Sequence, residues 1–152
     1  MDVKHVTPFL ESFKNVMNQF GFSNVQTGNM SKKGKEIIAS GLVLIVGIFG
    51  EIKGNVAYVI NEEDSKEVAS AMMMGMPVTT LDDMAKSAIS ELSNMLTANA
   101  VTSFSNMGIK ADISPPSLFQ GEDISLSMSS GTVLALQMKA DNVSIEINIS
   151  FE

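Results

Sequence analysis

The chain opens on an apolar pattern that predicts an amphipathic helix over residues 2–20. Its apolar residues recur at steps of three and four, which places them on one face of a helix. These residues are Val3, Val6, Phe9, Leu10, Phe13, Val16, Met17 and Phe20. Pro8 favours a regular helix that begins there with Thr7 as its cap, and Gly21 is placed to end it.

Two apolar runs after residue 40 predict a β-hairpin. Residues 42–49 form an aliphatic, largely β-branched run, and residues 55–60 follow it after the glycine-bounded segment 50–54. A weaker strand is expected over residues 23–31. The lysine cluster at 32–35 is expected in an exposed turn.

Two helices are expected in the middle of the chain. Asn61 followed by the acidic residues 62–64 is typical of a helix start, because the side chain can cap free N–H groups and the carboxylates face the positive end of the helix dipole. A longer helix follows this short one. It is expected to take Thr80 or Asp82 as its cap and to run to about Met107.

The last part of the chain is expected to be extended. Residues 111–114 lead into Pro115-Pro116, which cannot continue a central strand and so mark an irregular crossing, and residues 121–123 are expected in a turn. Strands over 133–138 and 143–151 close the chain. The last one alternates apolar and polar residues, which predicts one dry and one wet face, and it is expected to be an open edge or a pairing edge between subunits.

In this order of elements a helix followed by three strands occurs twice, which indicates a duplicated αβββ unit. The expected fold class is α/β (α+β), a mostly antiparallel sheet of about six strands with three helices packed on it. With 152 residues, 45% of them hydrophobic, the chain is long enough for one core and too short for two comfortable domains. We therefore expect a single domain over residues 1–152. If the alternating last strand is an open edge, its exposed backbone would favour aggregation, so we expect the sheet to be extended across a dimer.

Composition removes most routes to catalysis. The chain has no Cys, no Trp and no Arg, and its single histidine is His5, so a thiol nucleophile, a Cys or His zinc site, an arginine finger and a Ser-His-Asp triad are excluded or disfavoured. We expect His5, near the chain terminus, to be exposed and to have no role. The chemistry has to come from carboxylates, amides and hydroxyls.

Charge and hydropathy narrow the partners and the location. The net charge is −7 and the ten lysines are dispersed apart from the cluster at 32–35, so no electrostatic footprint for nucleic acid or an anionic membrane is present. The longest apolar run, residues 42–49, is far shorter than the roughly 20 residues that span a bilayer. No charged-then-apolar leader opens the sequence, so the cytoplasm is the expected location.

Two further kinds of cluster have a structural explanation. Met72, Met73, Met74 and Met76 could form an adaptable docking surface, but methionines at helical spacing more often fill a core, and we favour packing in the core. The acidic residues at 62–64 and 82–83 resemble metal ligands. They stand where carboxylates favour helix starts, so no metal site is expected.

The remaining candidate for chemistry is the pair Glu91 and Asn94 on the long helix. Residues three apart on a helix are neighbours, so both side chains are expected side by side at one edge. The small residues Ser87 and Ala98 flank them and would let a partner approach closely. The core-facing stripe is expected to consist of Leu81, Met84, Ala85, Ala88, Leu92, Met95 and Leu96. On spacing alone, two solvated side chains are the commoner explanation of such a pair.

A wider set of features resembles the CheC/CheX/FliY family of chemotaxis phosphatases. The Glu-x-x-Asn motif of Glu91 and Asn94 is followed by the Pro115-Pro116 loop and preceded by the glycine-bounded hairpin turn at 50–54, as in that family. The order of elements agrees as well. The resemblance extends over most of the chain.

The first helix lacks a second copy of the motif, which family members with two active sites carry. Lys14 stands three residues after Glu11, where the amide would be, and Asn15 comes one residue late. A single motif in a short chain is similar to the CheX branch of the family. That branch has an α/β fold and dimerises by joining sheets edge to edge.

The resemblance implies hydrolysis of the aspartyl phosphate on a phosphorylated CheY-type response regulator, by a homodimer. It implies no cofactor of the protein's own, because the receiver domain supplies the phosphoaspartate, its Mg²⁺ and a lysine. Asn94 would orient the attacking water, Glu91 would pair with the receiver's lysine, and Ser87 and Ala98 would lie against the substrate. The alternative is a non-catalytic module that binds a response regulator or a flagellar-switch component through the same helix edge.

Overall fold

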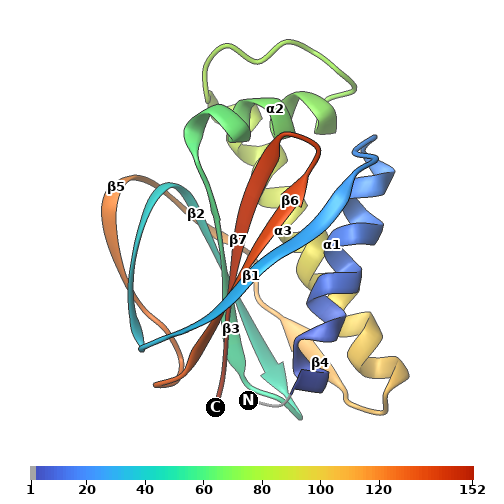
Figure 1. Cartoon of the computed structure of the whole chain (residues 1–152), viewed down its shortest axis with the longest axis vertical. Helices are drawn as coiled ribbons and strands as arrows, with labels where there is room; N and C mark the ends of the chain where they lie inside the picture. Colours follow the sequence, from blue (N-terminus) through green and yellow to red (C-terminus); the bar gives the residue numbers. More distant parts are fainter. Residues whose placement is uncertain (1–2) are drawn as a thin grey trace.

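The computed structural model describes residues 3–152, in which a seven-stranded sheet carries helices on one face (Figure 1). The helices are α1 (Thr7–Gln19), α2 (Glu62–Met72) and α3 (Asp83–Asn106), with a 3₁₀ turn at Val3–His5 before α1. The strands are β1 (Val25–Lys33), β2 (Glu36–Gly50), β3 (Gly54–Ile60), β4 (Ala111–Ile113), β5 (Ser117–Ser127), β6 (Val133–Ala140) and β7 (Val143–Phe151). The predicted fold class, a mostly antiparallel sheet with three helices packed on it, is confirmed.

The strand order is β1-β6-β7-β3-β2, and both β4 and β5 pair with the outer side of β2, every pair being antiparallel. The order is symmetric about the central pair β3 and β7. The first strand of each half pairs with the second strand of the other half, β1 with β6 and β5 with β2. This symmetry agrees with the predicted αβββ duplication. Seven strands form instead of about six because residues 111–127 make two strands, separated by residues 114–116.

The last strand is not an edge, which corrects the expectation from its alternating pattern. β7 lies between β6 and β3, and the polar residues Asn148 and Ser150 on its predicted wet face are buried. The β5–β6 connection crosses this face, and the Ser130 N–H donates to Ser150 Oγ at 2.8 Å. The sheet's free edges are β1 on one side and β4 with β5 on the other.

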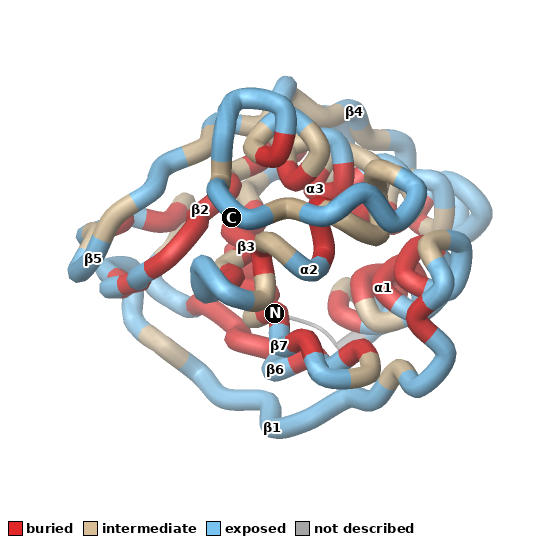
Figure 2. Tube along the Cα trace, turned by 90° about the horizontal axis from the view of Figure 1, so that it is seen from above, coloured by how far each residue is buried: buried red, intermediate tan, exposed pale blue. Residues whose placement is uncertain are grey.

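The main core lies between the helices and one face of the sheet. Apolar residues of α1, α2 and α3 meet alternate residues of β2, β3, β6 and β7 there. In Figure 2 the buried residues gather in this layer, whereas the edge strand β1 is exposed along most of its length. A smaller apolar cluster on the opposite face includes Val43, Ala57 and Met128. Within residues 3–152, no helix combines the length and the apolar content that crossing a membrane requires.

Two predicted turns are parts of strands. Lys32 and Lys33 belong to β1, and the reversal occupies only Gly34 and Lys35. Residues 121–123 lie inside β5, where the register with β2 shifts and Asp123 adopts a φ of 51°. Such a bulge bends the strand without reversing the chain, which explains why the local turn signal was misleading.

The helix ends follow the predicted chemistry in the middle of the chain and depart from it at the start. Asn61 Oδ1 accepts from the Asp64 N–H at 2.7 Å, and Asp82 Oδ1 accepts from the Ala85 N–H at 2.9 Å, so these two residues cap α2 and α3. The cap residue of α1 is Val6 rather than Thr7, and no side chain caps that end. Of the predicted first helix, residue 2 lies outside the described part.

The exposure expected of His5 is not observed. Its ring is partly buried and lies 5.5 Å from the ring of Phe151 and 6.0 Å from that of Phe104, measured between centroids. The 3₁₀ turn thus folds back on an aromatic cluster, which holds the start of α1 against the end of α3.

The buried face of α3 is rotated relative to the predicted stripe. Met84, expected in the core, is 63% exposed, whereas Ser93 and Thr97 are buried. Both hydroxyls are satisfied within the helix, since Ser93 Oγ donates to the Ser90 carbonyl at 2.7 Å and Thr97 Oγ1 to the Ser93 carbonyl at 2.8 Å. Polar residues can face a core when their hydrogen bonds are made there.

Candidate active site

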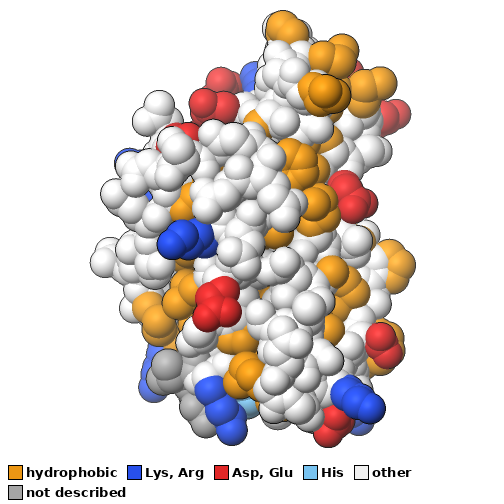
Figure 3. Space-filling model, turned by 90° about the vertical axis from the view of Figure 1, so that its right-hand side faces the viewer, with side chains coloured by type: hydrophobic (Ala, Val, Ile, Leu, Met, Phe, Trp, Pro, Cys, Tyr) orange, Lys and Arg blue, Asp and Glu red, His pale blue; other side chains and the backbone are white. Residues whose placement is uncertain are grey.

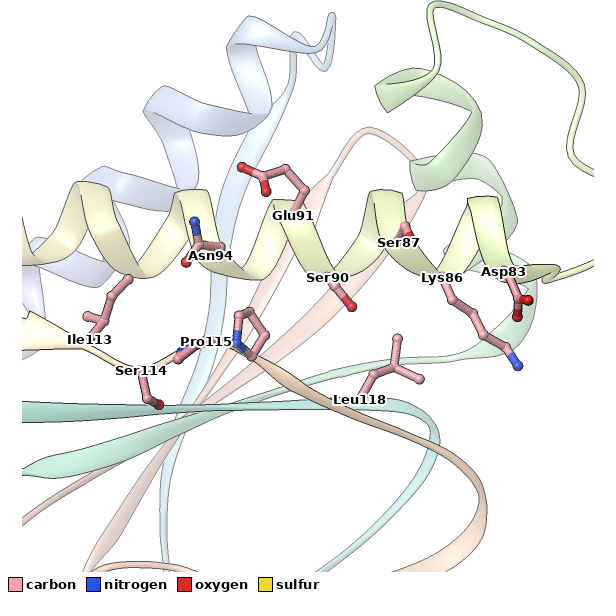
Figure 4. Close-up of a pocket in the computed structure, with 11 residues that line it drawn as sticks. Asp83, Lys86, Ser87, Ser90, Glu91, Asn94, Ile113, Ser114, Pro115 and Leu118 are labelled. Atoms are coloured by element: carbon pink, nitrogen blue, oxygen red, sulfur yellow. The ribbon is translucent and has the colours of Figure 1, made fainter.

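An open groove of about 680 Å³ runs between the N-terminal half of α3 and the segment that joins β4 to β5. Its lining residues are Asp83, Lys86, Ser87, Ser90, Glu91, Asn94, Ile113, Ser114, Pro115, Pro116 and Leu118. Figure 4 shows the segment with Ser114 and Pro115 passing alongside α3. The groove therefore joins a helix edge to a proline-rigid stretch of chain.

Buried hydrogen bonds fix the rotation of α3 above the sheet. Tyr58 Oη and Thr97 Oγ1 lie 2.8 Å apart, and burial raises the pKa of the Tyr58 hydroxyl, which stays neutral. From the side of α1, buried Ser12 donates to the Leu96 carbonyl. Because these contacts hold the inner side of the helix at residues 96 and 97, the residues opposite them must point outward.

Glu91 and Asn94 occupy that outer edge. Glu91 is exposed and Asn94 is half-buried. In Figure 4 Asn94 lies between the outward-pointing Glu91 and the Pro115 segment, and Ser90 points toward that segment. In the described part of the chain no hydrogen bond or ion pair engages either functional group. Both are free to contact a molecule that docks on the helix.

The opposite wall of the groove is held by a close approach of two chain segments. The Ser114 N–H donates to the Gly47 carbonyl at 2.9 Å, and the Gly47 N–H donates to Ser114 Oγ at 2.8 Å. A Cβ at position 47 would lie 2.9 Å from Ser114 Oγ, a separation too short for an ordinary contact. Glycine at this position therefore sets where Ser114 and the following prolines stand.

The predicted site residues are only partly brought together. Ser87, Glu91 and Asn94 line the groove, whereas Ala98 does not, although it is exposed on the same edge one turn beyond Asn94. Along α3 the lining of the groove ends at Asn94, so Ala98 lies beyond it.

Sequence reasoning missed four polar residues of the groove, Asp83, Lys86, Ser90 and Ser114. Ser90 stands four residues before Asn94, so helical spacing could have identified it. Ser114 belongs to another element, and no sequence signal places it beside α3.

The groove offers amide, carboxylate, hydroxyl and ammonium groups. Across residues 3–152, no three acidic or histidine side chains lie close enough together to hold a metal ion. The groove is open and its carboxylate and amide are unengaged, so it can supply one or two polar groups to a reaction centre carried by another molecule. The open groove does not form an enclosed pocket for a small substrate.

Known proteins match both the sequence and the fold. Residues 42–139 match the family described as chemotaxis phosphatase CheX. The CheY-P phosphatase CheX of Thermotoga maritima is 33% identical over 136 residues, which cover 90% of this chain and 87% of that protein.

Solved structures agree in fold. CheX of Desulfovibrio desulfuricans superimposes with a TM-score of 0.85 at 21% identity, over 98% of this chain and 99% of that one. CheX in a CheX-CheY-BeF3-Mg²⁺ complex from Borrelia burgdorferi gives a TM-score of 0.82 at 25% identity, over 97% of both chains. Taken with the sequence matches, these likenesses confirm the resemblance: the chain belongs to the chemotaxis phosphatase CheX family.

Proposed function

We propose that this protein hydrolyses the aspartyl phosphate of a phosphorylated CheY-type response regulator, with Glu91 and Asn94 as its catalytic pair. The observation that carries the proposal is the position of both side chains on the outer edge of α3, beside an open groove. Membership of the CheX family and 33% identity to a CheY-P phosphatase support this substrate. An open edge suits a folded protein substrate, which can bring its own phosphate to the helix.

Asn94 is the residue assigned to the attacking water. A side-chain amide has a carbonyl acceptor and N–H donors, so it can hold a water molecule in line with the bond to be broken. The water oxygen bonds to phosphorus while the bond between phosphorus and the aspartyl oxygen breaks. The aspartate leaves as a carboxylate and both water protons end on the released phosphate, so no covalent intermediate forms on this protein.

Glu91 is assigned to docking. Its exposed carboxylate stands one turn before Asn94 and can pair with the lysine of the receiver's active site. Such a pair would place the amide of Asn94 over the phosphate. Ser87, small and groove-lining, would lie against the substrate, and Ala98 would leave room for the receiver at the far end of the same edge.

We assign the Mg²⁺ of the reaction to the substrate, the receiver domain. Mg²⁺ bound by the receiver would neutralise the charge that develops on the phosphoryl oxygens. A relative forms a complex that contains CheY and Mg²⁺, which supports this division of labour. The protein then needs no cofactor of its own.

The test is the decay of phosphorylated, Mg²⁺-loaded CheY with a trace of this protein. Asn94→Ala should abolish turnover yet still bind the phosphorylated receiver, and Glu91→Ala should lose binding as well. Asn15→Ala is the matched control, because Asn15 is an exposed asparagine on α1 away from the groove. Wild-type rates in both site variants would overturn the assignment. Protection of the phosphate at one equivalent would indicate a binding module.

Two further expectations accompany the reaction. We place it in the cytoplasm, and we expect a homodimer that extends the sheet. Because β7 is central, the pairing edge has to be β1 or the side that carries β4 and β5. Analytical ultracentrifugation that finds only monomer at micromolar concentration would contradict the dimer.

A further inference from the structure

Met84 is an exposed apolar residue on the catalytic edge of α3. It is 63% exposed and precedes Glu91 by seven residues, about two helical turns, so both side chains leave the helix on the same side. Its neighbour Asp83 lines the groove. The edge that presents Glu91 and Asn94 therefore continues into an apolar side chain.

The connection between α2 and α3 adds two more exposed methionines at this end. Met74 is 98% exposed and Met76 is 57% exposed. Met74 has a φ of 60°, a left-handed conformation that residues other than glycine rarely adopt, so its backbone is held at a cost with the side chain fully in solvent. Figure 1 shows the connection arching over the end where α3 begins, and Figure 3 shows hydrophobic side chains gathered there.

For Met74 and Met76 these exposures overturn the expectation that the methionines of this region fill the core. Met72 does pack against the core, but Met74 and Met76 do not. Of the eight large hydrophobic residues exposed in the described part, Met74, Met76 and Met84 stand at this one end of the molecule, while the others are dispersed over β1, β2, β5 and the far end of α3.

We propose that Met74, Met76 and Met84, the methionine patch, form the apolar half of the docking surface for the receiver domain whose phosphate reaches Asn94. The inference rests on the proposed function. The methionine patch contacts an apolar face of the receiver, next to the receiver's phosphorylation site. The patch supplies affinity, whereas the Glu91 and Asn94 edge supplies chemistry.

A receiver domain suits this end of the molecule because a protein partner needs an apolar contact beside the polar edge. A specific protein complex buries roughly 800 Å² on each partner and has an apolar centre. The apolar residues of the groove, Ile113, Pro115, Pro116 and Leu118, belong to its opposite wall. The helix edge itself offers Ser87, Glu91 and Asn94, which are small or polar, so on the helix side the apolar contact falls to exposed Met84. Met84 is in line with that edge. Methionine is unbranched and flexible, so the patch can adapt to receiver surfaces that differ in shape.

The test separates docking from chemistry in the wild-type background. Met84→Gln should raise KM for the phosphorylated receiver about tenfold and leave kcat unchanged, because an interaction made equally in the ground and transition states is removed. Met84→Leu, which keeps the apolar surface, should stay within about twofold of wild type. Met107→Gln is the matched control, since Met107 is an exposed methionine at the other end of the same helix.

Direct binding distinguishes this inference from the proposed function. Affinity for the phosphorylated receiver is measured calorimetrically with two proteins: the single variant Asn94→Ala and the double variant Asn94→Ala/Met84→Gln. If the wild-type protein does not hydrolyse the phosphorylated receiver, the proposed function is wrong. Binding that is tenfold weaker in the double variant than in Asn94→Ala would still support the methionine patch. Equal affinities, or a change confined to the oligomeric state, would overturn the inference, the latter because the patch would then contact a second copy of the chain.

Discussion

Helices α1 and α3 hold equivalent places in the two halves of the fold, yet they present different chemistry. Each packs on the same face of the sheet and leads into a strand that pairs with the other half. α3 presents Glu91 and Asn94. At the same spacing α1 presents Glu11 and Lys14, both exposed.

The strand that follows each helix differs as well. After α1 the chain enters β1, a strand with one irregularity in its register. After α3 it forms the three-residue β4, breaks at residues 114–116 and resumes as β5. Only this break brings a proline-rigid segment alongside the helix to make the groove. Under the proposed assignment, the helix motif therefore acts together with the opposing wall.

The largest expected effect comes from giving α3 the residue that α1 has. Asn94→Lys should lower the rate of CheY-P hydrolysis by at least about 100-fold, because the amide that we propose orients the water is replaced by a group that can only donate. Single-turnover decay of the phosphorylated receiver measures it. Lys14→Ala serves as the control and should leave the rate unchanged.

The converse exchange, which gives α1 the residue that α3 has, tests whether the motif is sufficient by itself. Lys14→Asn completes a Glu-x-x-Asn motif on α1, but Lys14 lines none of the described grooves, and the small pocket beside Glu11 involves Thr7 and Met107 instead. In an Asn94→Ala background this exchange should restore no activity. Recovered turnover would mean that the motif suffices without the opposing wall.

A middle-sized effect is expected from the wall itself. In Gly47→Ala the new Cβ would meet Ser114 Oγ at 2.9 Å, so Ser114 has to move and give up the bond it accepts from the position 47 N–H. We expect kcat/KM to fall about tenfold with the fold intact. Gly131→Ala is the control, because a Cβ there meets nothing within 4 Å. An unchanged kcat/KM would show that the wall plays no part in catalysis.

The smallest effect concerns an ion pair that joins the two halves, Lys33 of β1 with Glu146 of β7. Burial alone would raise the pKa of Glu146, but hydrogen bonds from Lys33 and Gln137, with the Lys33 charge, hold it below its usual value. Because the folded pKa is lowered, the pair stabilises the protein above the unfolded pKa of about 4.3, and this contribution is lost as pH falls through the folded pKa.

Urea unfolding as a function of pH measures this contribution. At pH 7 Glu146→Gln should lower the free energy of unfolding by about 1 kcal/mol, and the difference from wild type should shrink as the pH drops below about 4. Glu63→Gln, at a pair whose carboxylate side chain is 84% exposed, should change little at any pH. A difference for Glu146→Gln that stays constant down to pH 3 would contradict the coupling.

Local signals predicted much of the fold and part of the site. The caps Asn61 and Asp82, the hairpin of β2 and β3, and the helical neighbourhood of Glu91 and Asn94 all depend on residues close in sequence, and the structure has each of them. The family resemblance, which was drawn from a motif and a loop that are also short-range patterns, was confirmed by similarity over most of the chain.

Features that depend on neighbours distant in sequence were predicted wrongly or not at all. The alternation of β7 indicates that one face is apolar, but it cannot say that β3 and β6 flank the strand or that the β5–β6 connection covers Ser150. Met84 was predicted to lie in the core because it is apolar. The rotation of α3, set by Tyr58 and Ser12 on other elements, turned it outward.

Residue type and helical spacing are properties of the chain alone, so they are enough to say which chemical groups are available and on which helix they stand. Tertiary structure decided that Glu91 and Asn94 face a groove, that Ala98 lies beyond it and that methionines extend their edge. A groove has two walls, and here they come from separate segments of the chain. The second wall, at Ser114, is held in place by Gly47, 67 residues away along the chain.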